Sequence, residues 1–261
     1  MSLKAPRSVA VALTSTALMG LSALAVPGAA NAQAITCNDS AATYEVTGGS
    51  VQWGVKQSFR SYLQGPIAKG GWTLSQDVGF LGTPGGADGR FVWPVVADDS
   101  SVAGAAAATA SGTGSIQMTG HDGILDTTLS NPTVTISGTQ GSLKMDYLAK
   151  KAESFTPGAA YTWVQGEQVV AVNFTLPTAP NFHGAGTVTA VSGGTSLEDT
   201  FNEALGDVYP AGSAMDPVTL VLDIDRTCEV DPGDGDDDDD QGTTPPGVFG
   251  SLGNLFGSLG A

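Results

Sequence analysis

Residues 115–148, which read SIQMTGHDGILDTTLSNPTVTISGTQGSLKMDYL, decide the fold class of this chain. Apolar and polar side chains alternate over 123–130 and again over 133–137, which is the period of a strand with one buried face. Gly, Asn-Pro and Gln-Gly steps bound four pieces of strand length, at 115–119, 123–130, 133–137 and 142–148. We therefore predict a meander of antiparallel strands with one solvated face.

The strand pattern extends to both sides of this meander. Further strands are predicted at 43–46, 72–80, 91–96, 161–164, 168–176, 186–192 and 217–224. The small residues of 100–114 predict a loop, and Pro94 predicts that its strand lies at an edge or ends there. With two short α-helices, over 51–63 and 195–205, these strands predict one all-β antiparallel domain, a β-sandwich or barrel-like fold, over 35–230.

The first 32 residues are typical of a secretory signal peptide. Lys4 and Arg7 precede an apolar stretch at 9–26, and Ala30 and Ala32 form a cleavage motif of small residues. We therefore expect the mature protein to be exported, and to be either secreted or associated with the cell envelope.

Two further segments follow the predicted domain. Residues 231–247 are acidic and rich in Pro and Gly, as in a solvated linker, and residues 248–261 form an apolar, Gly-rich tail that carries FGSLG twice. Neither contains the roughly 20 apolar residues of a membrane-spanning helix, so we expect no membrane span after the signal peptide. The net charge is −16, or −18 without residues 1–32, so we expect no nucleic-acid partner.

The two cysteines, Cys37 and Cys228, lie near opposite ends of the predicted domain. In an exported chain such a pair predicts one disulfide between the first and last strand regions. The alternative is a thiol-based metal or catalytic site, for which the sequence offers no partner residues.

The predicted helix over 51–63 carries the first candidate functional residues. Ser50 is placed to cap its start, and Gly65 followed by Pro66 is placed to end it. A tyrosine on the buried face of such a helix either fills the core or serves a ligand, and periodicity alone does not separate these two roles. The residues that share this face, at i, i+3, i+4 and i+7, are Val55, Ser58, Phe59 and Tyr62.

A second candidate lies in the turn Gly120-His121-Asp122-Gly123 between two predicted strands. Glycines on both sides of His121 let the backbone approach a ligand closely, although an exposed turn histidine is the simpler alternative. The sequence has two histidines and no Gly-x-Ser-x-Gly, His-Glu-x-x-His or P-loop motif. We therefore expect that the protein is not an enzyme.

Three segments, in order along the chain, resemble the HtaA family, the haem-binding domains of actinobacterial haem-uptake systems. They are WGVKQSFRSYLQG at 53–65, GHDGILDTTLSNPTVTISG at 120–138 and GxxYPAGxAMDPVTLVL at 206–222. The resemblance extends over roughly residues 43–225 and implies a haem-binding β domain.

The resemblance also implies a haem ligand. In this family a tyrosine of the first helix is the axial ligand of ferric haem, and a histidine of the central β region hydrogen-bonds to it. These positions correspond to Tyr62 and His121, with haem b in the ferric state as the expected cofactor. A phenolate is a hard anionic donor that suits Fe(III), and a hydrogen bond from His121 would tune its strength.

Position along the chain suggests the remaining pocket residues. Val55 and Phe59 are expected against the porphyrin, and Tyr209 is the second tyrosine expected in the pocket. Ser58 or Arg60 is expected near the propionates, with a solvent-exposed Arg60 as the alternative. The resulting hypothesis is an exported protein that captures ferric haem and passes it to another haem-uptake protein or to the binding protein of a transporter. The alternative is a structural or adhesive protein of the cell envelope, which would use the same β domain without haem and its FGSLG tail for attachment.

Overall fold

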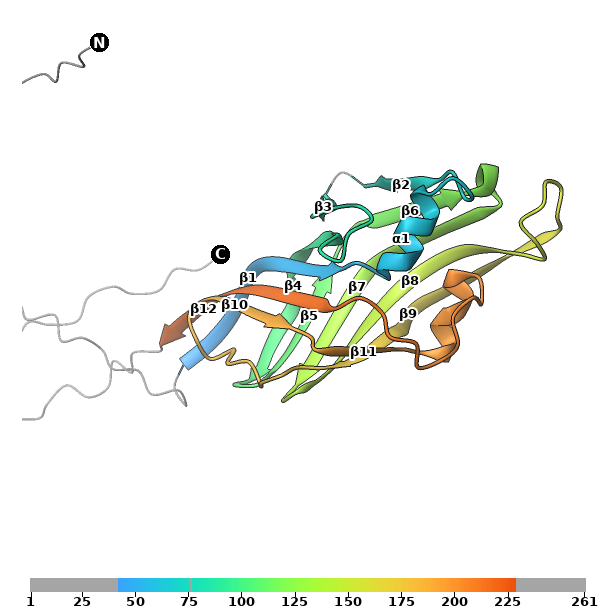
Figure 1. The fold of residues 1–261 in the computed structure, drawn as a ribbon. Helices are drawn as coiled ribbons and strands as arrows, with labels where there is room; N and C mark the ends of the chain where they lie inside the picture. Colours follow the sequence, from blue (N-terminus) through green and yellow to red (C-terminus); the bar gives the residue numbers. More distant parts are fainter. Residues whose placement is uncertain (1–41, 76, 229–261) are drawn as a thin grey trace, which may run out of the picture. The chain divides into compact units, whose positions relative to one another are not determined.

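The computed structural model describes residues 42–75 and 77–228 (Figure 1). The helical segments are the α-helix α1 (Gln57–Gln64) and the 3₁₀-helices η1 (His121–Gly123) and η2 (Asp199–Leu205). The strands are β1 (Ala42–Trp53), β2 (Gly71–Leu74), β3 (Gly79–Leu81), β4 (Arg90–Gly104), β5 (Ala107–Gly112), β6 (Ser115–Gly120), β7 (Leu125–Ser137), β8 (Gln140–Ala152), β9 (Tyr161–Thr175), β10 (Gly186–Val191), β11 (Gly194–Leu197) and β12 (Val218–Cys228).

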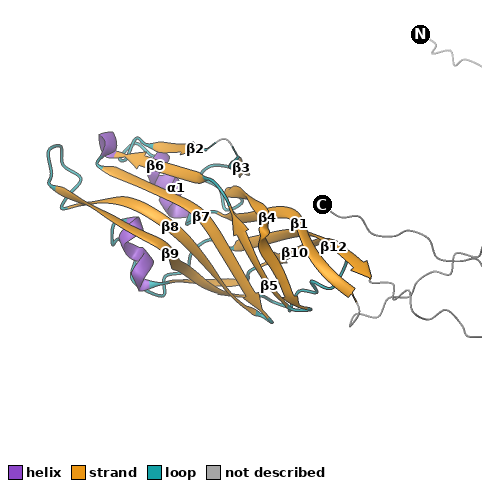
Figure 2. Cartoon of the chain, turned by 180° about the vertical axis from the view of Figure 1, so that it is seen from behind, coloured by secondary structure: helices purple, strands orange, loops and turns teal. Residues whose placement is uncertain are grey.

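The strands of this described part form one antiparallel sheet. Their main path runs β10-β12-β1-β4-β5-β7-β8-β9-β11, while β2, β3 and β6 pair beside it. The sheet twists and curls into a half-barrel, which Figure 1 and Figure 2 show from opposite sides. Both views place η1, η2 and the connection from β8 to β9 at the same end of the sheet. The predicted all-β antiparallel fold with short helices is confirmed.

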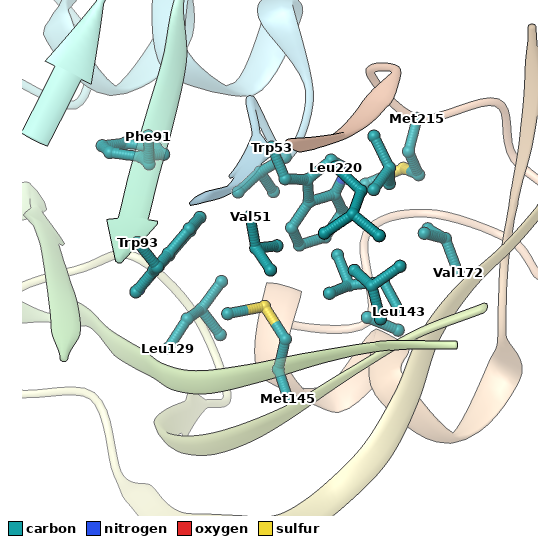
Figure 3. Close-up of a cluster of buried hydrophobic side chains, with 14 of the residues drawn as sticks. Val51, Trp53, Phe91, Trp93, Leu129, Leu143, Met145, Val172, Met215 and Leu220 are labelled. Carbon is teal, nitrogen blue, oxygen red and sulfur yellow. The ribbon is translucent and has the colours of Figure 1, made fainter. Parts of the chain in front are cut away.

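Large apolar side chains from distant strands meet on the inner face of the sheet (Figure 3). Trp53 of β1, Trp93 of β4, Leu129 of β7 and Met145 of β8 are all fully buried, and Leu220 of β12 is 1% exposed. Burying one such side chain contributes about 1.5–3 kcal/mol to stability, so these contacts hold the curled sheet closed around its core.

Two predicted pairs of strands are single, bulged strands. β7 continues through Asn131 and β9 continues through Gln168, and both residues have a left-handed backbone with φ of 48°. Asp146 of β8 holds both bulges, because its carboxylate accepts the side-chain amide of Asn131 at 2.9 Å and the backbone N–H of Gln168 at 2.8 Å. A bulge interrupts the alternation of side chains without ending the strand, which is why the sequence suggested two strands each time.

The predicted loop over 100–114 is wrong. Most of it belongs to β4 and β5, where Ala108 and Ala110 point into the core with exposures of 2% and 0%. Pro94 lies where the pairing of β4 with β1 stops and its pairing with β5 begins, so the strand itself continues past the proline.

The first helix begins later than predicted. Val51 and Trp53 belong to β1, where they pair with Trp93 and Phe91 of β4, so the first part of the predicted helix is the end of a buried strand. The residue before α1 is Lys56, and Ser50 therefore does not cap the helix. The second predicted helix, over 195–205, is instead split between the short strand β11 and the 3₁₀-helix η2.

The predicted signal peptide, linker and tail lie outside the described residues, and so does Cys37. The disulfide between Cys37 and Cys228, the last residue of β12, therefore stays a prediction. Within residues 42–75 and 77–228, none of the helices is long and apolar enough to cross a membrane.

Candidate functional site

The fold brings Tyr62 and His121 into direct contact although they lie 59 residues apart in the sequence. Tyr62 lies in the last turn of α1, and its Oη is hydrogen-bonded to Nε2 of His121 at the start of η1. The two ring centroids are 5.7 Å apart, with a tilt of 43° between the planes. A phenol paired with an imidazole is a donor set that can bind a metal ion through the oxygen.

α1 is anchored at both its face and its start, so the position of Tyr62 is well defined. Phe59 and Leu63 are buried on the core side of the helix, with exposures of 4% and 0%. The backbone N–H of Gln57 donates to the carboxylate of Asp216 at 2.9 Å, which satisfies a free N–H at the helix N-terminus. Tyr62, adjacent to the buried face, is then left half-buried at the helix end.

His121 is held by its backbone in a turn of unusual conformation. His121 and Asp122 have left-handed φ angles of 52° and 55°. The N–H of His121 donates to Ala68 O at 2.7 Å, which ties this turn to the segment that follows α1. Gly120 allows the close approach, because a Cβ there would lie 3.2 Å from a methyl carbon of Leu63. Gly120 thus serves the packing of α1 on the turn.

Tyr209 joins the site from the loop after η2. Burial raises the pKa of Tyr209 above its usual value of 10.0, a hydrogen bond with Ser58 partly offsets this, and the nearby Tyr62 raises the pKa further. The ammonium of Lys56 lies 5.4 Å from the centre of the Tyr209 ring and donates to Ala214 O at 2.5 Å. Tyr209 therefore stays a neutral hydroxyl next to Ser58 and Tyr62 at physiological pH.

A narrow, mostly apolar cavity lies beside α1, with a volume of about 30 Å³, and Thr127 and Lys150 supply its polar side chains. Its wall combines Phe59 of α1, Leu125 of β7, Phe155 from the β8–β9 connection, and Leu205 at the end of η2. Pockets for small organic ligands usually measure about 300–1,000 Å³, so a porphyrin requires this cavity to widen.

Comparison with known proteins identifies the family. The model of the HtaA family, described as Htaa, matches residues 48–221. The chain belongs to the HtaA family. A comparison with curated protein sequences gives no match.

Solved structures from Corynebacterium glutamicum are similar to this HtaA domain. The haem-binding protein HtaB is 28% identical with a TM-score of 0.59, and the match covers 72% of this chain and 100% of that one. The N-terminal domain of HtaA is 27% identical with a TM-score of 0.60, covering 69% and 98%. The C-terminal domain of HtaA is 27% identical with a TM-score of 0.57, covering 70% and 100%.

The HtaA domain places five of the predicted site residues together and two elsewhere. Tyr62 meets His121, and Tyr209 meets Ser58, in one region next to the cavity wall formed by Phe59. Val55 is fully buried in the turn before α1, with a left-handed φ of 63°, and does not lie on the helix.

Arg60 is also fully buried, and its guanidinium points into a different environment from Tyr62. It donates to Pro84 O at 3.0 Å and to Gly86 O at 2.6 Å, and it forms further hydrogen bonds with Gly54 O and the carboxylate of Asp216. The N–H groups of Arg60 that a propionate would need are already bound to these partners. The structure therefore assigns Arg60 to stabilising the fold rather than to the site.

Two residues near the site were not predicted. Phe155 stacks on His121, and Lys150 donates to Gly123 O at 2.9 Å. Neither lies in a motif or a periodic pattern, and both come close only because the β8–β9 hairpin reaches the η1 turn. The sequence therefore held no local indication of either contact.

Proposed function

We propose that this HtaA domain binds ferric haem b with the Tyr62 phenolate as axial ligand. The observation that carries the proposal is the hydrogen bond between Tyr62 Oη and His121 Nε2 beside an apolar cavity. Free tyrosine has a pKa near 10, so its ionisation at neutral pH needs the charge of the bound iron. His121 supports the phenolate by donating a hydrogen bond to it, as a neighbouring group commonly does for a metal ligand.

The other residues of the site suit the two parts of a haem molecule. Phe59 and Leu205 offer apolar surface for the porphyrin, whose burial supplies most of the binding energy. The hydroxyls of Ser58 and Tyr209 can donate to the propionates, because burial keeps Tyr209 protonated. We assign no such role to Arg60.

At the level of the whole protein, we propose a non-enzymatic haem carrier outside the cytoplasm. The predicted signal peptide supports export, to a secreted or envelope-associated location, and the similarity to HtaB and HtaA supports haem as the ligand. The carrier would pass haem to another haem-uptake protein or to the binding protein of a transporter. The half-buried position of Tyr62 suits such a transfer, because the ligand residue is not enclosed in the core.

The test is a hemin titration of the wild type, Tyr62→Phe and Tyr44→Phe, followed by absorption spectroscopy. Tyr62→Phe keeps the ring that packs against the turn and removes only the ligand oxygen. We expect a saturable Soret band with a ferric tyrosinate spectrum in the wild type and in the control Tyr44→Phe, and its loss in Tyr62→Phe.

Two outcomes would contradict the proposal. A wild-type tyrosinate spectrum that persists in Tyr62→Phe would move the ligand to another residue. The absence of any saturable band in the wild type would remove haem binding itself.

A further inference from the structure

The ring of His121 contacts a second aromatic residue besides Tyr62. Phe155, in the connection between β8 and β9, stacks on the imidazole with a centroid distance of 4.5 Å and an angle of 14° between the planes. Phe155 is 43% exposed, which is unusual for a phenylalanine that fills a core. Its place is explained by this contact with His121 rather than by burial.

His121 needs such a contact, because little else fixes its ring. Its backbone lies in a left-handed turn between Gly120 and Gly123, and Gly120, the residue before it, has no side chain to pack against the ring. The hydrogen bond to Tyr62 holds one nitrogen of the ring but does not define the plane of the ring. A parallel aromatic stack does define this plane.

The same hairpin also holds the backbone of the turn. Lys150 of β8 donates to Gly123 O at 2.9 Å and lies 3.5 Å from the carboxylate of Asp126. Its ammonium is 5.2 Å from the ring centres of both Tyr161 and Trp163 of β9. The two aromatic rings and the carboxylate around Lys150 restrict its motion, so the β8–β9 hairpin holds the η1 turn at Gly123 while Phe155 covers the ring of His121.

We infer that Phe155 is a positioning residue for His121: its stacked ring sets the imidazole plane so that Nε2 meets Tyr62 Oη, and it thereby tunes the haem ligand without touching the iron. The effect on haem rests on the proposed function, whereas the stacking is a property of the haem-free domain. The inference predicts that removing the ring of Phe155 disturbs the Tyr62–His121 hydrogen bond in both states.

The first test uses the haem-free protein and NMR. The chain has two histidines, and the second, His183, stacks on Tyr44 with a centroid distance of 4.1 Å, so it provides an internal reference. A stacked ring shifts the ring protons of its partner upfield. Phe155→Ala should move the ring-proton resonances of His121 downfield and leave those of His183 in place.

The matched control is Leu148→Ala, because Leu148 lies on the same hairpin and is 42% exposed. It should move neither histidine. Phe155→Tyr, which keeps the stack, should restore the His121 resonances to positions near those of the wild type. Unchanged His121 resonances in Phe155→Ala would overturn the inference, whether or not the protein binds haem.

The second test uses the haem-loaded protein. In Phe155→Ala we expect a shifted phenolate-to-iron charge-transfer band. Haem should also be lost to a competing apoprotein about 2- to 10-fold faster than from the wild type, which is the ratio that corresponds to the loss of one aromatic stack. Phe155→Tyr should restore both. If Phe155→Ala kept the wild-type charge-transfer band and changed only the rate of haem association, making it faster, Phe155 would merely shield the site from haem. That result would overturn the inference.

Discussion

Replacing Arg60 with methionine should destabilise the domain strongly while leaving the Tyr62 ligand intact. The guanidinium of Arg60 is fully buried and joins three segments that are distant in the sequence. It donates to Gly54 O before α1, to Pro84 O and Gly86 O in the loop before β4, and to the carboxylate of Asp216 before β12. Methionine keeps the unbranched apolar stem and removes every one of these donors.

The magnitude follows from the burial of the pair. Removing one partner of a buried ion pair usually costs about 3–5 kcal/mol, because the other charge is left uncompensated. Asp216 is 16% exposed and keeps the N–H of Gln57 as a partner, so water and the helix N-terminus relieve part of this cost. We therefore expect a loss of about 3–4 kcal/mol, which in a domain of this size corresponds to a melting temperature lower by about 6–16 °C.

The assay is equilibrium unfolding in guanidinium chloride, followed by tryptophan fluorescence and circular dichroism. Arg90→Met is the matched control, because Arg90 is less buried and donates to Gln52 Oε1 at 2.7 Å and to Asp88 O at 3.1 Å. It should cost about 1 kcal/mol or less. At low temperature, where both variants are folded, both should bind hemin with the wild-type spectrum.

The reasoning would be refuted if Arg60→Met lost less than about 1 kcal/mol of stability and bound hemin much more weakly than the wild type. That result would mean that Arg60 meets a propionate when haem is bound. A double-mutant cycle with Asp216→Asn separates the two cases, because a structural pair shows a coupling energy in the haem-free protein.

Three further predictions concern other parts of the domain. His121→Ala should weaken hemin binding by about 10- to 100-fold, because Tyr62 loses a charge-assisted hydrogen bond; an unchanged dissociation constant in the titration would exclude this role. The pKa of Tyr209 is raised in the folded state, so its contribution to stability is complete below pH 10 and is lost as the pH rises through the folded pKa. The free energy of unfolding should therefore fall less steeply at alkaline pH in Tyr209→Phe than in the wild type. An equally steep fall in the variant would contradict this. Reduction of the predicted disulfide between Cys37 and Cys228 should cost up to about 4–5 kcal/mol of stability, measured by denaturant unfolding with and without reductant, and free thiols in the native unreduced protein would show that the bond is absent.

The fold could be predicted where side-chain period and burial agree. The alternation over 133–137 became the inward and outward faces of β7, with Val134 and Ile136 in the core. The predictions were wrong where tertiary packing decided the conformation. Val51 and Trp53 fell within the predicted helix over 51–63, but they pair as strand residues with β4, which buries both side chains. The local sequence pattern cannot distinguish a helix from a strand here, because an apolar side chain is expected at a buried position of either element.

The candidate site likewise contains residues that could be predicted from the sequence and residues that could not. The segments around Tyr62 and His121 were recognisable because they lie in continuous motifs, although their contact depends on the packing of α1 on the η1 turn. Phe155 and Lys150 belong to the β8–β9 hairpin, and their importance follows only from its reach across to that turn. Arg60 lies two residues before Tyr62 in the same motif. Residues two apart on a helix point to different sides, so nearness in sequence to Tyr62 was a misleading reason to place Arg60 at the propionates.

The backbone carries a further indication of where the functional region lies. Left-handed φ angles are unfavourable for residues with a side chain, by about 1–2 kcal/mol each, and such strain in folded proteins gathers at functional sites. Two of these residues in the described part of the chain, Asn131 and Gln168, form the bulges held by Asp146. The others lie in the turns before and after α1, in η1 and after η2, namely Val55, Lys69, His121, Asp122 and Asp207. The strained turns therefore flank α1, which carries Tyr62, and include His121, the residue that meets the Tyr62 hydroxyl, as expected of a preorganised ligand site in an otherwise regular sheet.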